Sequence, residues 1–244
     1  MMKLAVRDDL IAGLTEGSRQ QLLTYRELLF RWNQRFNLTA IREREGIDTR
    51  LIGDALRLLP SLDSELRTRG RRVRLIDIGA GAGVPGLVLK IARPEIDITL
   101  VDATNKKMQF VQNAIAELGL SRARTVHGRA EDLGQHIDYR EQFDIVTARG
   151  VASLPTLVEL TLPLLVVGGV CLFPKGADLD EELREGQHAA KVLGGKIESA
   201  ELLPGIESEP VTRLVRGTKI GPTPGRYPRR AGVPKEEPLG RNGR

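Results

Sequence analysis

Cysteine, histidine and aromatic side chains are scarce in this chain of 244 residues. Its single cysteine, Cys171, excludes an intrachain disulfide framework and a cysteine-rich zinc cluster, and it fits a reducing compartment. The three histidines lack the spacing of metal ligands, so we expect no metal site. Aromatic residues make up 4% of the chain, too few for a broad platform on which bases could stack.

A long hydrophobic run is also absent. The longest uncharged stretch, residues 160–174, is interrupted by Pro163 and by a pair of glycines, and it is too short to span a bilayer. Acidic residues at Asp8 and Asp9, and the lack of an apolar segment near the start, exclude a secretory signal peptide. We therefore expect a soluble cytoplasmic protein that does not bind membranes.

Positive charge is concentrated at one end of the chain. Lysine and arginine total 37 against 32 acidic residues, a net charge of +5. Residues 216–244 hold eight basic and two acidic residues, which is +6, and this leaves −1 for the rest of the chain. A neutral body with a basic end predicts a polyanionic partner that is contacted from that end.

Residues 1–70 have the pattern of a helical N-terminal domain. Ser18, with Gln21 three residues later, predicts a capped helix start. Apolar residues then recur at helical spacing, at Leu22, Tyr25, Leu29, Trp32 and Phe36. A second amphipathic helix is predicted over residues 46–59, ending before Pro60, and residues 68–72 are predicted to form a linker.

Residues 71–220 have the alternation of an α/β domain. Apolar runs that predict strands occupy residues 73–78, 96–101, 125–127, 143–148 and 169–173. Helices are predicted between them, over residues 87–92, 106–118 and 154–165. This order predicts a Rossmann-like, doubly wound parallel sheet, followed by a hairpin over 196–202 and 213–220. Residues 221–244 are rich in proline and glycine and lack the apolar content for a core of their own, so they form a basic tail.

The first strand of the α/β domain leads into a glycine-rich turn. Asp77 is followed by Gly79, Gly81 and Gly83, and then by a helix. Glycine permits a positive φ and lets a ligand approach the backbone closely. The pattern formally matches the dinucleotide motif G-x-G-x-x-G, which is weak by itself, and a tight turn without a ligand remains an alternative.

Other acidic residues define what the turn could hold. Asp102 ends the second strand, where a carboxylate can accept hydrogen bonds from both ribose hydroxyls of an adenosine. Residues 128–132, which include Ala130 and Glu131, follow the third strand and suit the edge of an adenine. Asp77 would repel a pyrophosphate but suits a cationic ligand. The pattern therefore favours S-adenosylmethionine as cofactor, with a nicotinamide cofactor and an oxidoreductase as the alternative.

The absence of motifs typical of other methyltransferases limits which atom the methyl group could be transferred to. Residues 147–153, after the fourth strand, lack the Asn/Asp-Pro-Pro-aromatic run common in enzymes that methylate exocyclic amines. Cys171 lies in the middle of a predicted strand, a poor place for a nucleophile. Guanine N7 has a free lone pair at neutral pH, so its methylation requires positioning rather than a general base. We expect no catalytic acid or base.

Several segments, in this order, resemble the ribosomal RNA small subunit methyltransferase G family, also called glucose-inhibited division protein B. They are Trp32-Asn33, Phe36-Asn-Leu-Thr-Ala-Ile41, Asp77-Ile-Gly-Ala-Gly-Ala-Gly83, Pro85-Gly86, Val101-Asp102, Lys106-Lys107, Gly128-Arg-Ala-Glu131, Phe143-Asp-Ile-Val-Thr-Ala-Arg149, Pro163, Gly168-Gly169, Lys175-Gly176, Tyr227-Pro-Arg-Arg230, Gly232 and Pro234. The resemblance implies a class I methyltransferase that methylates N7 of a guanosine in 16S ribosomal RNA, near the decoding site, and releases S-adenosylhomocysteine.

The resemblance also implies which residues contact the donor. These are Gly79, Val84, Asp102, Ala130, Glu131 and Arg149. The chain departs from the family at three positions: Leu51 and Ala55 lie in a stretch that usually carries histidine and serine, and Ala103 replaces a serine. Asp54 of that stretch is retained.

Basic residues outside the donor site are candidates for contact with RNA. Lys106 and Lys107 open a predicted helix, where the helix dipole disfavours cations, and Lys175 follows the fifth strand. Tyr227, Arg229 and Arg230 combine a ring that can stack with two phosphate-binding guanidinium groups. We expect a monomer whose partner is 16S ribosomal RNA or the small ribosomal subunit. A non-catalytic RNA-binding module is a further alternative.

Overall fold

The computed structural model describes residues 3–205 and 211–240. Within these residues a seven-stranded sheet has the order β3-β2-β1-β4-β5-β7-β6. Its strands are β1 (Arg74–Ile78), β2 (Asp97–Asp102), β3 (Ala123–His127), β4 (Phe143–Ala148), β5 (Leu165–Lys175), β6 (Gly195–Leu202) and β7 (Arg213–Lys219). Strands β1 to β5 pair in parallel, and β7 is antiparallel to both β5 and β6. The predicted doubly wound fold and its late hairpin are confirmed.

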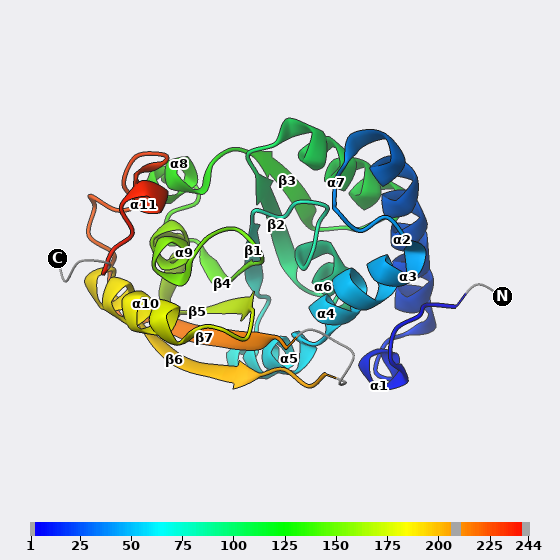
Figure 1. Ribbon diagram of the computed structural model, residues 1–244, viewed down its shortest axis with the longest axis horizontal. Coiled ribbons are helices and arrows are strands. Elements are labelled where there is room, and N and C mark those ends of the chain that lie inside the picture. The colour runs from blue at the N-terminus through cyan, green and yellow to red at the C-terminus, as the bar shows by residue number, and fades with distance from the viewer. Residues whose placement is uncertain (1–2, 206–210, 241–244) are drawn as a thin grey trace.

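Helices cover both faces of the sheet (Figure 1). Those of the α/β part are α6 (Gly86–Ala92), α7 (Asn105–Glu117), α8 (Ala130–Gln135), α9 (Leu154–Thr161), α10 (Asp180–Val192) and α11 (Val233–Glu236). Neighbouring residues of one strand face different layers: Leu100 joins the core under α6 and α7, while Val101 joins the core under α8, α9 and α10. A strand buried on both faces reads as a continuous apolar run, which is why the sequence marks it clearly.

The N-terminal segment packs on one face of the sheet rather than building a separate core. Its helices are α1 (Asp8–Ile11), α2 (Glu16–Phe36), α3 (Arg44–Ile47), a π-helical turn (Asp48–Gly53), α4 (Asp54–Leu56) and α5 (Leu59–Arg69). Leu22 and Tyr25 of α2 belong to the same buried cluster as Leu87 of α6 and Phe110 of α7. Tyr25 donates a hydrogen bond to the carbonyl of Ala82, 2.8 Å away, in the glycine-rich turn.

Some predicted boundaries are wrong, and each error has a local cause. Thr15, not Ser18, caps α2, because the Thr15 hydroxyl accepts the N–H of Ser18 at 3.1 Å while the Ser18 hydroxyl donates to Ile91 O. Pro60 lies in the first turn of α5, where its missing N–H costs nothing, so the segment predicted as a linker is helical up to Arg69.

A third error concerns the segment after β4. The predicted helix over 154–165 ends at Thr161, a 3₁₀ turn spans Leu162–Leu164, and β5 begins at Leu165. Pro163 has no N–H to donate, so the α-helical hydrogen bonding stops there. The strand is consequently longer than the run of residues 169–173 from which it was predicted.

Asp77 is buried beneath the turn that follows β1. Its Oδ2 accepts the N–H of Gly86 at 2.9 Å, while Oδ1 has no hydrogen-bond partner among the described residues. A Cβ at position 86 would lie 2.7 Å from Oδ2, so only glycine fits there. Burial raises the pKa of Asp77 to about 8, and the charge of Asp102 adds to the effect, while the Gly86 hydrogen bond opposes it.

The buried carboxyl predicts a pH dependence of stability. An unfolded aspartate ionises near pH 4, roughly, whereas Asp77 in the folded chain keeps its proton until about pH 8. Between these values the folded state binds one more proton than the unfolded state. The free energy of unfolding therefore decreases as pH rises, by up to about 1.4 kcal/mol per pH unit. Asp77→Asn mimics the neutral form, so its free energy of unfolding, measured by urea denaturation, should differ less between pH 5 and pH 7.5 than that of the wild type. Asp138→Asn, at an exposed position, should follow the wild type. Parallel pH profiles for Asp77→Asn and the wild type would contradict the assignment.

Candidate active site

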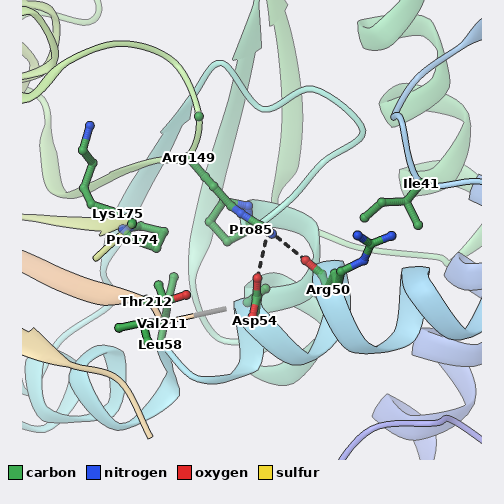
Figure 2. Close-up of a pocket in the computed structure, with 13 residues that line it drawn as sticks. Ile41, Arg50, Asp54, Leu58, Pro85, Arg149, Pro174, Lys175, Val211 and Thr212 are labelled. Atoms are coloured by element: carbon green, nitrogen blue, oxygen red, sulfur yellow. Dashed lines mark hydrogen bonds and ion pairs between the residues drawn. The ribbon is translucent and has the colours of Figure 1, made fainter. Parts of the chain in front are cut away.

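Two cavities adjoin at the carboxyl edge of the parallel strands, where ligands bind in doubly wound folds. The first, called the donor crevice here, is lined by residues at or after the ends of β1, β2, β3 and β4 and by residues of the tail, among them Gly79, Asp102, Ala130, Glu131, Val151 and Lys235. The second, called the acceptor pocket, includes Ile41, Arg50, Asp54, Pro85, Arg149 and Lys175 (Figure 2). Gly150 lines the acceptor pocket and the next residue, Val151, lines the donor crevice. One loop therefore separates the two cavities.

The glycine-rich turn forms one side of the donor crevice. Gly79, Gly81 and Gly83 have φ angles of +68°, +58° and +90°, a region that other residues rarely adopt. Gly81 donates its N–H to Asp102 Oδ2 at 3.0 Å, and Thr104 donates its N–H to Asp102 Oδ1 at 2.8 Å. Asp102 therefore fixes the turn while it lines the crevice.

These contacts decide which ligand fits the crevice. A pyrophosphate needs free backbone N–H groups in the turn, but the Gly81 N–H is taken by a carboxylate. Asp102 presents two oxygens that each accept a single backbone hydrogen bond, which leaves lone pairs for hydroxyl donors. Val151 and Leu160 add apolar surface suited to a purine. The residues present thus fit an adenosyl compound without phosphate.

The predicted donor residues do not all reach the crevice. Gly79, Asp102, Ala130 and Glu131 line it. Gly81 and Gly83 shape the turn, and a Cβ at position 83 would lie 2.6 Å from Leu87 Cδ1. Val84 is buried, and Asp77 lies fully buried against the N–H of Gly86.

Arg149 points into the acceptor pocket rather than the donor crevice. Its Nη2 donates to Asp54 Oδ2 at 2.9 Å and to the Arg50 carbonyl at 2.8 Å (Figure 2). Its Nη1 is buried without a hydrogen-bond partner in the described part of the chain. Asp54 also accepts a hydrogen bond from Arg57 at 3.2 Å. The ion pair of Arg149 with Asp54 joins the segment after β4 to α4, a contact that the sequence alone did not indicate.

The basic residues predicted to contact RNA differ in exposure and in whether they pair with acidic residues of this chain. Lys106 is exposed at the start of α7, and Lys107 lies 3.8 Å from Asp102. Lys175 forms an ion pair with Glu182 at 2.6 Å. Arg230 is exposed.

Tyr227 and Arg229 are turned towards the protein. Only 7% of Tyr227 is exposed, so its ring is not available to stack on a base. Arg229 is paired with Glu159, which is fully buried. Arg226 is exposed beside the Tyr227 ring, and neither it nor Lys235 was singled out from the sequence.

Comparison with known proteins agrees with the geometry. The family model described as GidB, rRNA small subunit methyltransferase G, matches residues 18–207. Among curated relatives, the ribosomal RNA small subunit methyltransferase G of Chloroflexus aggregans is 44% identical over 93% of this chain and 92% of its own length. The protein of the same name from Exiguobacterium sibiricum is 43% identical over 93% of each chain.

Solved structures agree on the fold. An antibiotic-resistance methyltransferase, Kmr, has a TM-score of 0.50 at 20% identity and covers 66% of this chain and 93% of its own. A 16S rRNA (adenine(1408)-N(1))-methyltransferase from Catenulisporales acidiphilia has a TM-score of 0.50 at 15% identity and covers 66% of this chain and 92% of its own. In the described ranges we find no helix of sufficient length and apolarity for a membrane span. The sequence motifs, the strand order and the relatives agree, and the chain belongs to the rRNA small subunit methyltransferase G family.

Proposed function

We propose that the chain transfers the methyl group of S-adenosylmethionine to N7 of a guanosine in 16S ribosomal RNA and releases S-adenosylhomocysteine. The observation that carries this function is the pair of adjoining cavities, one suited to an adenosyl compound and the other lined by Arg149 and Asp54. A nicotinamide dinucleotide is disfavoured because its pyrophosphate would meet the committed N–H of Gly81 and the acid at Asp102.

In the donor crevice, Asp102 holds the ribose hydroxyls, and the segment of Ala130 and Glu131 faces the adenine. When bound, S-adenosylmethionine supplies an electrophilic methyl group whose bond to sulfur breaks with the electron pair left on sulfur. The chain has no proton to remove, because guanine N7 carries a free lone pair. Its residues accelerate the reaction by aligning the two partners and excluding water.

In the acceptor pocket, Arg149 and Asp54 are suited to a guanine. A guanidinium N–H can donate to guanine O6, and a carboxylate can accept from guanine N1–H and the exocyclic amine. Arg149 and Asp54 both line the pocket, and the hydrogen bond from Arg149 Nη2 to Asp54 Oδ2 holds the two side chains together there. A base flipped from its stack into this pocket would face the loop that separates the two cavities.

The RNA itself is held by exposed cations around this edge. Lys106 lies in the first turn of α7, four residues after Asp102, and Arg226 and Arg230 are exposed on the tail. These side chains can neutralise phosphates without reading sequence. The partner is 16S ribosomal RNA or the small subunit, and the chain works as a monomer in the cytoplasm.

The function is tested by methylating small subunits from cells that lack this protein. Labelled S-adenosylmethionine should transfer label to one guanosine, and strand scission at N7-methylguanosine should map it. Naked 16S ribosomal RNA, tested alongside, defines the form of the substrate. Label on another base or another atom, or no label on any form, would overturn the proposal.

Asp102→Asn should weaken donor binding. Asparagine keeps the size of the side chain but loses the charge and one acceptor, so it cannot hold Gly81, Thr104 and a ribose together. We expect the Kd for S-adenosylhomocysteine to rise about ten-fold or more in calorimetric titration, equivalent to about 1.4 kcal/mol. Asp97→Asn, at the other end of β2, should bind like the wild type. Equal affinities for Asp102→Asn and wild type would refute the assignment.

Arg149→Gln should show whether Arg149 acts in binding the RNA or in binding the methyl donor. If Arg149 serves the acceptor, kcat/KM for the small subunit should fall about 100-fold, roughly 2.7 kcal/mol of transition-state stabilisation, while the Kd for S-adenosylhomocysteine changes less than about two-fold. Arg31→Gln, which removes one positive charge from the exposed side of α2, should alter neither quantity. A parallel loss of donor affinity would instead place Arg149 in the donor site, as the family resemblance implies.

A further inference from the structure

The described part of the tail lies against α8 and α9 (Figure 1). Gln135 of α8 donates to the Pro228 carbonyl at 2.8 Å, and Thr156 of α9 donates to the Pro234 carbonyl at 2.8 Å in a buried contact. Arg140 donates to the Tyr227 carbonyl at 2.7 Å. Bonds to backbone carbonyls fix the path of a segment, whatever its side chains.

The strongest of these attachments is the ion pair between Arg229 and Glu159. The guanidinium grips both carboxylate oxygens, with Nε 2.9 Å from Oε1 and Nη2 2.7 Å from Oε2, and the Arg229 N–H adds a third bond at 2.9 Å. Glu159 is fully buried in α9, and its hydrogen bond raises the pKa of Arg229. A buried carboxylate that loses such a partner is left uncompensated, so the contact holds the tail firmly.

Just beyond this pair, the tail reaches the donor crevice. Gly232 and Lys235 line it, together with Thr156, whose hydroxyl holds Pro234. Gly232 also donates its N–H to Glu131 Oε1 at 3.1 Å, and thereby fixes the carboxylate that faces the adenine. Its φ of +94° is a conformation that side chains rarely adopt.

We propose that residues 232–235 form a wall of the donor crevice, and that the Arg229–Glu159 pair is the positioning element that holds this wall in place. Gly232 orients Glu131 through its N–H. The aliphatic stem of Lys235 covers the adenosyl group while its ammonium stays in water. The tail thus acts in donor binding, and Arg229 serves the cofactor rather than the RNA.

Binding of S-adenosylhomocysteine to the full chain tests this role. We expect Gly232→Ala and Arg229→Gln to raise the Kd about ten-fold or more, and Lys235→Ala to raise it about three-fold to ten-fold. Arg229→Lys, which keeps the charge but not the two-pronged grip, should recover part of the loss. Lys191→Ala removes an exposed lysine of α10 and should bind like the wild type.

The readouts distinguish a wall of the crevice from a merely structural tail. If Arg229→Gln lowers the melting temperature, the variants at Gly232 and Lys235, which lie near the surface, still decide the question. In turnover assays their KM for the methyl donor should rise with the Kd, while the KM for the small subunit stays constant. Unchanged Kd values for Gly232→Ala and Lys235→Ala overturn the proposal, as does a rise confined to the KM for RNA.

The role of the tail rests on the proposed donor, but the two can fail separately. A wild-type chain that does not bind S-adenosylhomocysteine would refute the proposed function. A wild-type chain that binds it, with variants of equal affinity, would refute only the wall formed by the tail.

Discussion

The Asp102 carboxylate is the contact on which the active site depends. It joins the turn after β1 to the turn after β2 by accepting the N–H groups of Gly81 and Thr104. A second acidic side chain, Asp77, which is buried and protonated at neutral pH, supports the same glycine-rich turn from beneath by accepting the N–H of Gly86. The N–H groups of Gly81 and Gly86 are therefore already bonded to acidic side chains and are not available to a phosphate. The same bonds that make the turn rigid also select a donor without phosphate.

The N-terminal helices support this turn from a third direction. Tyr25 donates to the Ala82 carbonyl, and Ser18 donates to Ile91 at the end of α6. Both side chains come from α2, so this helix is bonded both to the turn and to the helix that follows it. Further along the same segment, Asp54 pairs with Arg149 across the acceptor pocket. The N-terminal segment thus lines the proposed acceptor pocket and also contributes to the core.

Local patterns explain which features could be predicted from the sequence. The parallel strands and the glycine-rich turn are marked by adjacent residues, and Asp102 follows from its place at a strand end. The contact of Arg149 with Asp54, 95 positions earlier in the chain, was not predicted. Glu159 and Arg229 are likewise 70 positions apart. Such pairs depend on packing between distant segments, and neither residue of a pair carries a local sign of the other.

The basic end of the chain, residues 216–244, shows why charge counted along a sequence overstates the charge offered to a partner. Arg216 pairs with Glu65 and Glu198, Lys219 is buried against Glu141, and Arg229 is held by Glu159. Each of these cations is matched by an acid from the neutral body of the chain, so it contributes to folding rather than to an external field. Among the described tail residues, the exposed cations are Arg226, Arg230 and Lys235. The tail has too little apolar content for its own core, and the body holds it by hydrogen bonds to its backbone carbonyls and by the ion pair of Arg229 with the buried Glu159. These contacts place it beside the donor crevice.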